Sequence, residues 1–87
     1  MDGKALVAWN LRRIRVERGV SQEQLAVDAG VDRTYVGRIE RGMENPTVGN
    51  LDKLADALGV HISALFMKPR PGERRAKPLR PGRKSPD

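Results

Sequence analysis

The stretch that most constrains the fold of this chain is SQEQLAVDAGVDRTYVGRIERG, residues 21–42. Ser21 can cap a helix, and Gln24, three residues later, gives the spacing of a capping box. Gly30 follows where a left-handed residue commonly ends a helix. Asp32 can cap a second helix, which Gly42 ends. The stretch therefore predicts two short helices joined by a turn of three or four residues.

The apolar residues of this stretch recur at helical spacing. Leu25 and Ala29 share one face of the first helix, and Val36 and Ile39 form the buried face of the second. Ala26 lies between the two faces, and its small side chain lets the helices cross at a steep angle. A generic helical hairpin does not need a small residue there. The pattern therefore indicates a helix-turn-helix, the motif whose second helix enters the major groove of DNA.

A longer helix is predicted before this motif, over about residues 4–18. Val7, Leu11 and Ile14 recur on one face of it, which we expect to be buried. Trp9 lies off that face. It either covers the edge of the core or belongs to a dimer surface.

Two more helices are predicted after the motif. Thr47 can cap the first of them, which Gly59 ends, and a short last helix covers roughly residues 62–67. Their apolar residues are expected to complete one core: Leu51, Leu54, Ala55, Leu58, Ile62, Leu65 and Phe66.

Taken together, these features resemble the lambda-repressor-like, or Xre-type, helix-turn-helix family over roughly residues 7–66. The run DRTYVGRIERG also resembles the controller proteins of restriction-modification systems. The resemblance implies an all-α fold, with a compact five-helix DNA-binding domain at residues 1–67 and the motif at its second and third helices. It also implies an ion pair between Arg15 and Glu40 that joins the first and third helices and is structural.

By the same resemblance, Arg33, Thr34 and Arg38 read base edges in double-stranded DNA. The planar fork of arginine can donate two hydrogen bonds to O6 and N7 of guanine. Thr34 could contact a thymine methyl group or a phosphate. The alternative is that all three are solvated surface residues.

Five further residues are expected to touch phosphates or flank the reading helix: Gln22, Tyr35, Gly37, Arg41 and Asn45. Resemblance places Gln22 on a phosphate, and Asn45 could clamp another. Tyr35 either stacks over the DNA backbone or braces the helix. Gly37 disfavours a helix by roughly 1 kcal/mol relative to alanine. Two explanations for a glycine at this position are open. Either the helix passes close to DNA there, or the glycine is tolerated because the position faces solvent.

The net charge of +6 lies entirely in the last segment. Residues 1–67 carry nine basic and nine acidic side chains, whereas residues 68–87 carry eight basic and two acidic ones together with five of the six prolines. Such a segment cannot build a core, so we expect a basic, Pro-rich disordered tail. The tail follows DNA phosphates, binds a protein partner or only aids solubility.

Composition also argues against several other classes of protein. The chain has no cysteine and a single histidine, His61, which we expect to cap the last helix or lie exposed, so no metal site or other cofactor is predicted. The Ser, His and Asp residues show no converging set, so we do not expect an enzyme. The first 15 residues contain no long apolar run, which predicts no signal peptide or membrane span and a cytoplasmic protein.

The predicted function is a sequence-specific transcriptional regulator that binds a palindromic operator as a homodimer. One short helix reads only a few base pairs, whereas two related by symmetry read half-sites about one helical turn apart. The alternative is an antitoxin-like or adaptor module that uses the same fold to bind a protein, with the tail folding around that partner.

Overall fold

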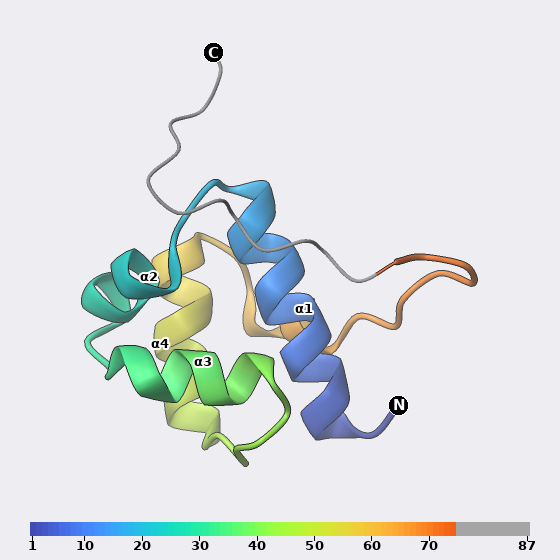
Figure 1. Cartoon of the computed structure of the whole chain (residues 1–87), viewed down its shortest axis with the longest axis horizontal. Coiled ribbons are helices and arrows are strands. Elements are labelled where there is room, and N and C mark those ends of the chain that lie inside the picture. The colour runs from blue at the N-terminus through green and yellow to red at the C-terminus, as the bar shows by residue number, and fades with distance from the viewer. Residues whose placement is uncertain (75–87) are drawn as a thin grey trace.

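Four α-helices and a final 3-10 helix make up the computed structural model, which describes residues 1–74 (Figure 1). They are α1 (Gly3–Glu17), α2 (Gln22–Ala29), α3 (Arg33–Glu40), α4 (Val48–Leu58) and η1 (Ile62–Phe66). Residues 1–74 contain no β-strand, so the predicted all-α class is confirmed. Most of the predicted disordered tail, residues 75–87, lies outside the described residues.

Capping side chains set the starts of the helices. Ser21 accepts a hydrogen bond from the Gln24 amide at 3.0 Å, and Asp32 accepts one from the Thr34 amide at 2.7 Å. Thr47 caps α4 in the same way, through the amide of Asn50 at 3.0 Å. These hydrogen bonds confirm the three predicted caps. Each one satisfies a backbone donor that the helix itself leaves unpaired. The capping box is only half formed, since the Gln24 side chain donates to Asp28 instead.

The turn of the helix-turn-helix depends on the conformation of Gly30. Its φ is +71°, in the left-handed region that side chains with a Cβ rarely adopt. The Gly30 and Val31 amides donate to the carbonyls of Val27 and Ala26, at 3.2 and 3.0 Å. This hydrogen-bonded pattern ends α2 and lets Asp32 begin α3 after three residues.

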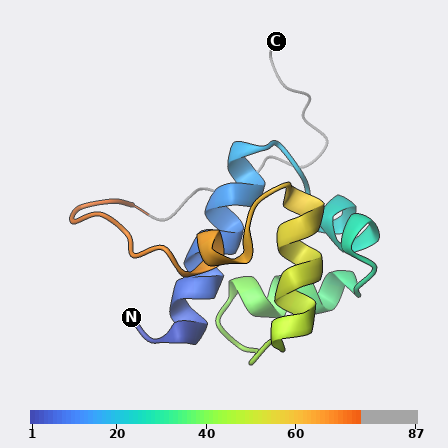
Figure 2. The same ribbon diagram turned by 180° about the vertical axis from the view of Figure 1, so that it is seen from behind.

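The core lies between the helices. α1 packs against α3 and η1, and α2 packs against α3 and α4. Figures 1 and 2 show α3 on one face of the molecule and α4 on the opposite face. The core consists of aliphatic side chains, each at most 9% exposed: Val7, Leu11, Ile14, Leu25, Ala26, Ala29, Val36, Ile39, Leu51, Leu54, Ala55, Leu58 and Leu65.

The last helix lies at the predicted place and is a 3-10 helix, Ile62–Phe66, but the prediction that Phe66 belongs to the core is wrong. With three residues per turn, Ile62 and Leu65 share the inner face, whereas Phe66 turns outward and is 44% exposed. Phe66 is therefore not a core residue. Pro69 soon follows and disfavours helical conformations in the residue before it, which helps to keep the helix short.

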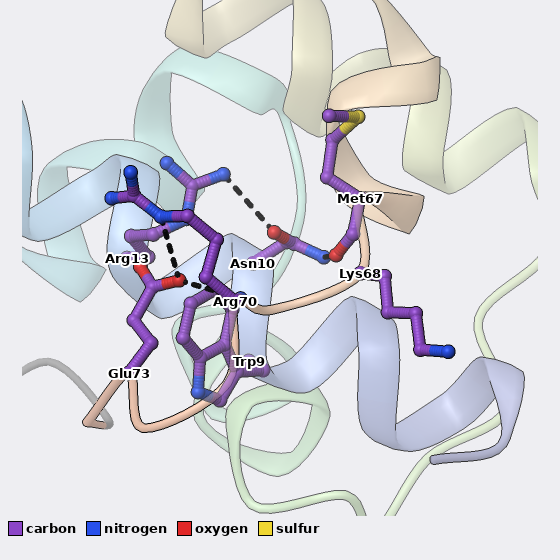
Figure 3. A pocket seen from close by; sticks show the side chains of 7 residues that line it. All are labelled: Trp9, Asn10, Arg13, Met67, Lys68, Arg70 and Glu73. Atoms are coloured by element: carbon purple, nitrogen blue, oxygen red, sulfur yellow. Dashed lines mark hydrogen bonds and ion pairs between the residues drawn. The ribbon is translucent and has the colours of Figure 1, made fainter.

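Asn10 fixes the segment that follows η1. This buried side chain donates from Nδ2 to the carbonyls of Leu65 and Met67, at 3.1 and 2.8 Å, and accepts from Arg13 at 3.0 Å. Beside it, the Arg13 guanidinium lies 5.5 Å from the centre of the Trp9 ring. These residues and the chain around Arg70 line a pocket of about 230 Å³. Figure 3 shows the side chains that line it. Trp9 is 7% exposed and packs at the edge of the core.

No helix in residues 1–74 combines the length and the apolar character that crossing a membrane requires.

Candidate nucleic-acid interface

The outer side of α3 carries the predicted base-reading residues. Arg33 and Thr34 are exposed in its first turn, and the Arg38 side chain, one turn later, is 43% exposed. The opposite side of the same helix is held by Val36 and Ile39, which are 0% and 1% exposed. α3 is thus a two-sided helix that is anchored by its apolar residues and presents polar ones to solvent.

A buried carboxylate joins α3 to α1. Glu40 is 0% exposed, and its two oxygens accept from Arg15 Nε at 2.6 Å and from Arg15 Nη2 at 3.0 Å. Arg15 Nη1 donates to the Val20 carbonyl at 2.9 Å, which ties in the turn before α2. Hydrogen bonds from both ends of the guanidinium therefore set the position of α3 on the body of the domain.

Two further side chains converge on the same carboxylate. Gln22 Nε2 donates to Glu40 Oε1 at 3.1 Å, and Arg12 Nε lies 3.4 Å from that oxygen. Glu40 thus links α1, α2 and α3. Among the described residues, no buried side-chain nitrogen or oxygen lacks a hydrogen-bond partner.

The pKa of Glu40 is lowered from its ordinary value. Burial alone raises the pKa of this carboxyl, and the hydrogen bonds from Arg15 and then Gln22 lower it by more. The carboxylate is therefore ionised at neutral pH, where it balances the positive charge of Arg15.

Gln22 lies in the first turn of α2, where a phosphate contact was predicted, but its side chain takes part in the Glu40 network. The amide nitrogen is held by the carboxylate, and Oε1 lies beside Gly37. In this position the side chain connects the start of α2 to the middle of α3. A contact to phosphate stays a prediction.

Gly37 is buried, so of its two proposed explanations the one that needs a solvent-facing position does not hold. A Cβ at this position would lie 3.3 Å from Nη1 of Arg41 and 3.6 Å from Oε1 of Gln22. The guanidinium of Arg41 therefore lies across the helix at Gly37. The absence of a side chain makes room for it, a tertiary reason that the helical propensity of glycine does not reveal.

Tyr35 and Asn45 are the last two of the residues predicted to flank the reading helix. The Tyr35 hydroxyl accepts from Asn50 Nδ2 at 3.0 Å, and its ring is partly buried against the core. Tyr35 thus braces α3 against α4, whereas stacking on DNA stays a prediction. Asn45 is exposed in the loop between those helices.

Sequence reasoning did not single out Glu44. Its Oε2 accepts from Arg38 Nε at 2.8 Å, and Arg38 Nη2 donates to the Met43 carbonyl at 3.4 Å. The two residues are six apart, which is not a helical spacing, so no periodicity links them. The available signal was Gly42, because a glycine at this position reverses the chain just after the helix.

His61 caps η1, as one of the two predicted roles requires. Its Nδ1 accepts from the amide of Ser63 at 3.1 Å, and its side chain is exposed. In the described part of the chain, no three His, Cys, Asp or Glu side chains lie together in a way that could hold a metal ion.

A short helix with exposed basic residues, joined to the helix before it by a turn at a glycine, is the arrangement of a DNA-binding helix-turn-helix. The comparison with known families agrees. The family model described as "Helix-turn-helix" matches residues 11–65, and this chain belongs to that family.

Similar proteins include a hypothetical transcription factor from Neisseria meningitidis, 46% identical over 78% of this chain. The match spans 64% of that relative, less than two thirds of its length. The crystal structure of the restriction-modification controller protein C.AhdI from Aeromonas hydrophila has a TM-score of 0.71 and 43% identity, covering 72% of this chain and 96% of that one. The controller protein C.Esp1396I, solved as a tetramer with its natural 35 base-pair operator, has a TM-score of 0.70 and 33% identity, covering 76% and 87%.

Proposed function

We propose that this protein is a sequence-specific transcriptional regulator that acts in the cytoplasm and reads a palindromic operator as a homodimer. The observation that carries the proposal is the two-sided α3, with Arg33, Thr34 and Arg38 outward and Val36 and Ile39 inward. The major groove admits an α-helix, and its base edges offer acceptors to outward arginines.

The proposed contacts fall into two groups. Arg33, Thr34 and Arg38 contact base edges and supply specificity. The remaining residues contact the backbone or shape the reading surface and set the register of the protein on the duplex. They are Gln22, Tyr35, Gly37, Arg41 and Asn45.

Two considerations support a symmetric operator. A helix of eight residues, α3, reaches only a few base pairs, so a second copy at one helical turn is needed for a longer site. The controller protein C.Esp1396I, a relative with the same fold, is a tetramer in complex with its operator.

The test begins with selection of bound sites from random DNA, followed by binding isotherms on the selected and a scrambled duplex. Arg38→Ala should weaken binding to the selected site by about 1 to 3 kcal/mol and barely change binding to the scrambled one, because a base contact carries discrimination. Gln22→Ala should weaken both duplexes alike. Lys53→Ala removes an exposed cation from α4, a helix outside the helix-turn-helix, and is the matched control.

Failure to enrich any site would contradict the proposed function. An equal loss on both duplexes for Arg38→Ala would instead assign that residue to the phosphate contacts. Half-site symmetry in the selected sequences, with a dimer in solution, is the result expected for the proposed homodimer.

A further inference from the structure

The loop that follows α3 returns toward the helix and brings a carboxylate to its outer surface. Gly42 is left-handed at φ +71°, and its amide donates to the Ile39 carbonyl at 3.0 Å. The next amide, of Met43, donates to the Arg38 carbonyl at 2.9 Å. This is the hydrogen-bond pattern of a Schellman motif, which fixes the path of the chain immediately after the helix. Glu44 is therefore placed by backbone hydrogen bonds close to Arg38.

The contact uses one particular edge of the arginine. Nε of Arg38 donates to Glu44 Oε2 at 2.8 Å, and Nη2 donates to the Met43 carbonyl at 3.4 Å. Nε–H and the neighbouring N–H of Nη2 form the side edge of the guanidinium. The outer edge, formed by Nη1 and the second N–H of Nη2, makes no hydrogen bond within residues 1–74. That outer edge is itself a two-donor fork that fits O6 and N7 of guanine.

The pair is neither deeply buried nor fully solvated. The Arg38 and Glu44 side chains are 43% and 30% exposed. An arginine side chain loses considerable rotamer freedom when it is ordered, so a partner that orders it before DNA arrives reduces the loss on binding. The same carboxylate would repel nearby phosphates. A pair of this kind is therefore expected to favour correct base contact at the expense of general affinity.

We propose that Glu44 is a positioning residue, which holds the Arg38 guanidinium with its outer edge directed at the base pairs and so sets specificity at the pair that Arg38 contacts. This inference rests on the proposed function, in which Arg38 reads a base. Glu44 acts through Arg38 and makes no base contact of its own.

The decisive experiment measures the dissociation constants of four proteins: wild type, Arg38→Ala, Glu44→Ala and Glu44→Gln. Each is measured on the selected site and on single-base variants of it. The base pair at which Arg38→Ala loses about ten- to hundredfold discrimination is the one that Arg38 reads. Glu44→Ala should lose about two- to fivefold at that base pair and at no other, because exposed ion pairs contribute modestly. Glu44→Gln keeps an oxygen that can accept from Nε and should restore part of the discrimination.

Glu23→Ala separates positioning from charge. Glu23 is an exposed residue of the same type in the first turn of α2. Both alanine variants should bind scrambled duplex somewhat more tightly than wild type, and only Glu44→Ala should lose discrimination. Unchanged discrimination in Glu44→Ala, or an equal loss at every base pair, would overturn the inference.

A measurement on the free protein tests the contact between Arg38 and Glu44 separately from the proposed DNA binding. In the free protein, the ¹⁵N–¹H signal of Arg38 Nε should shift in Glu44→Ala and return toward its wild-type position in Glu44→Gln. An Arg38 Nε signal that is the same in wild type and Glu44→Ala would refute the positioning contact itself. If that signal shifts but Arg38→Ala alters no base preference, the assignment of Arg38 as a base reader fails and the specificity role of Glu44 fails with it.

Discussion

Replacing Glu40 with alanine is expected to destabilise the fold by about 3 to 5 kcal/mol, because it leaves the buried charge of Arg15 unpaired. The Arg15 side chain is 4% exposed and would lose its hydrogen bonds at 2.6 and 3.0 Å, keeping only the one to the Val20 carbonyl. Arg12 and Gln22 are partly exposed, so they can turn to water and add little to the loss. A domain of this size has a total stability of roughly 3 to 10 kcal/mol, so this loss would be a large fraction of it.

Urea unfolding followed by circular dichroism measures this change through the midpoint and the slope of the transition. Glu17→Ala is the matched control. Glu17 is 61% exposed and pairs with Arg13 one turn away at 3.4 Å, a contact worth about 0.3 to 0.5 kcal/mol. The variant Arg15→Met should be destabilised less than Glu40→Ala. The double variant should be more stable than Glu40→Ala alone, because methionine leaves no buried charge.

The interaction energy between Glu40→Ala and Arg15→Met tests whether the two side chains form a coupled pair. A double-mutant cycle with an interaction energy well above about 0.5 kcal/mol, the usual limit for independent sites, is expected. Simple additivity of the two losses would refute the reasoning, as would a Glu40→Ala variant no less stable than Glu17→Ala.

Three other predictions concern pH, Gly37 and the tail. Folding lowers the pKa of the Glu40 carboxyl, so its stabilising contribution is present above the pKa that this carboxyl has in the unfolded chain. The contribution is lost as pH falls through the lowered pKa of the folded state. Urea midpoints should therefore drop on acidification, and they should drop less in Glu40→Gln. Gly37→Ala should raise thermal stability by up to about 1 kcal/mol, since alanine favours a helix and the exposed Arg41 side chain can move aside, yet it should weaken DNA binding if the displaced guanidinium contacts phosphate. Deleting residues 75–87 should weaken binding to selected and scrambled duplexes by a similar factor and make the salt dependence shallower by roughly 0.9 per lost phosphate contact. An unaltered slope would mean that residues 75–87 do not touch DNA.

The ends of α2, α3 and α4 could be predicted from the sequence because the physics that sets them is local. Ser21, Asp32 and Thr47 each bond an amide within three residues, and Gly30 adopts its left-handed conformation inside a hydrogen-bonded turn of its own neighbourhood. The apolar spacing then determines which faces meet. These signals remain in a single sequence because each involves residues only a few positions apart.

Contacts between residues far apart in the sequence explain what was missed. From the sequence alone Asn10 is an ordinary polar residue of a helix, but its Nδ2 also donates to the carbonyls of residues 55 and 57 positions away. From the sequence alone Gly37 is an unfavourable residue in a helix. In the structure, the side chains of Gln22 and Arg41 lie in the space beside it. For Asn10 and Gly37 the deciding partners are set by tertiary packing. Phe66 was expected in the core, but the chain there forms a 3-10 turn, whose period of three residues turns Phe66 outward.

Such contacts also determine how the charged residues of the domain are distributed between its surface and its interior. Residues 1–67 carry equal numbers of basic and acidic side chains, which by itself argues against affinity for a polyanion. On α3 the balance differs, because Glu40 is buried against Arg15 and Glu44 is paired with Arg38. The exposed charges that remain on α3 and its two capping residues are those of Arg33 and Arg41, against the one acidic residue Asp32 at the N-cap. A domain with no net charge can thus present a positive surface to phosphates when most of the acidic residues near that surface are buried or paired.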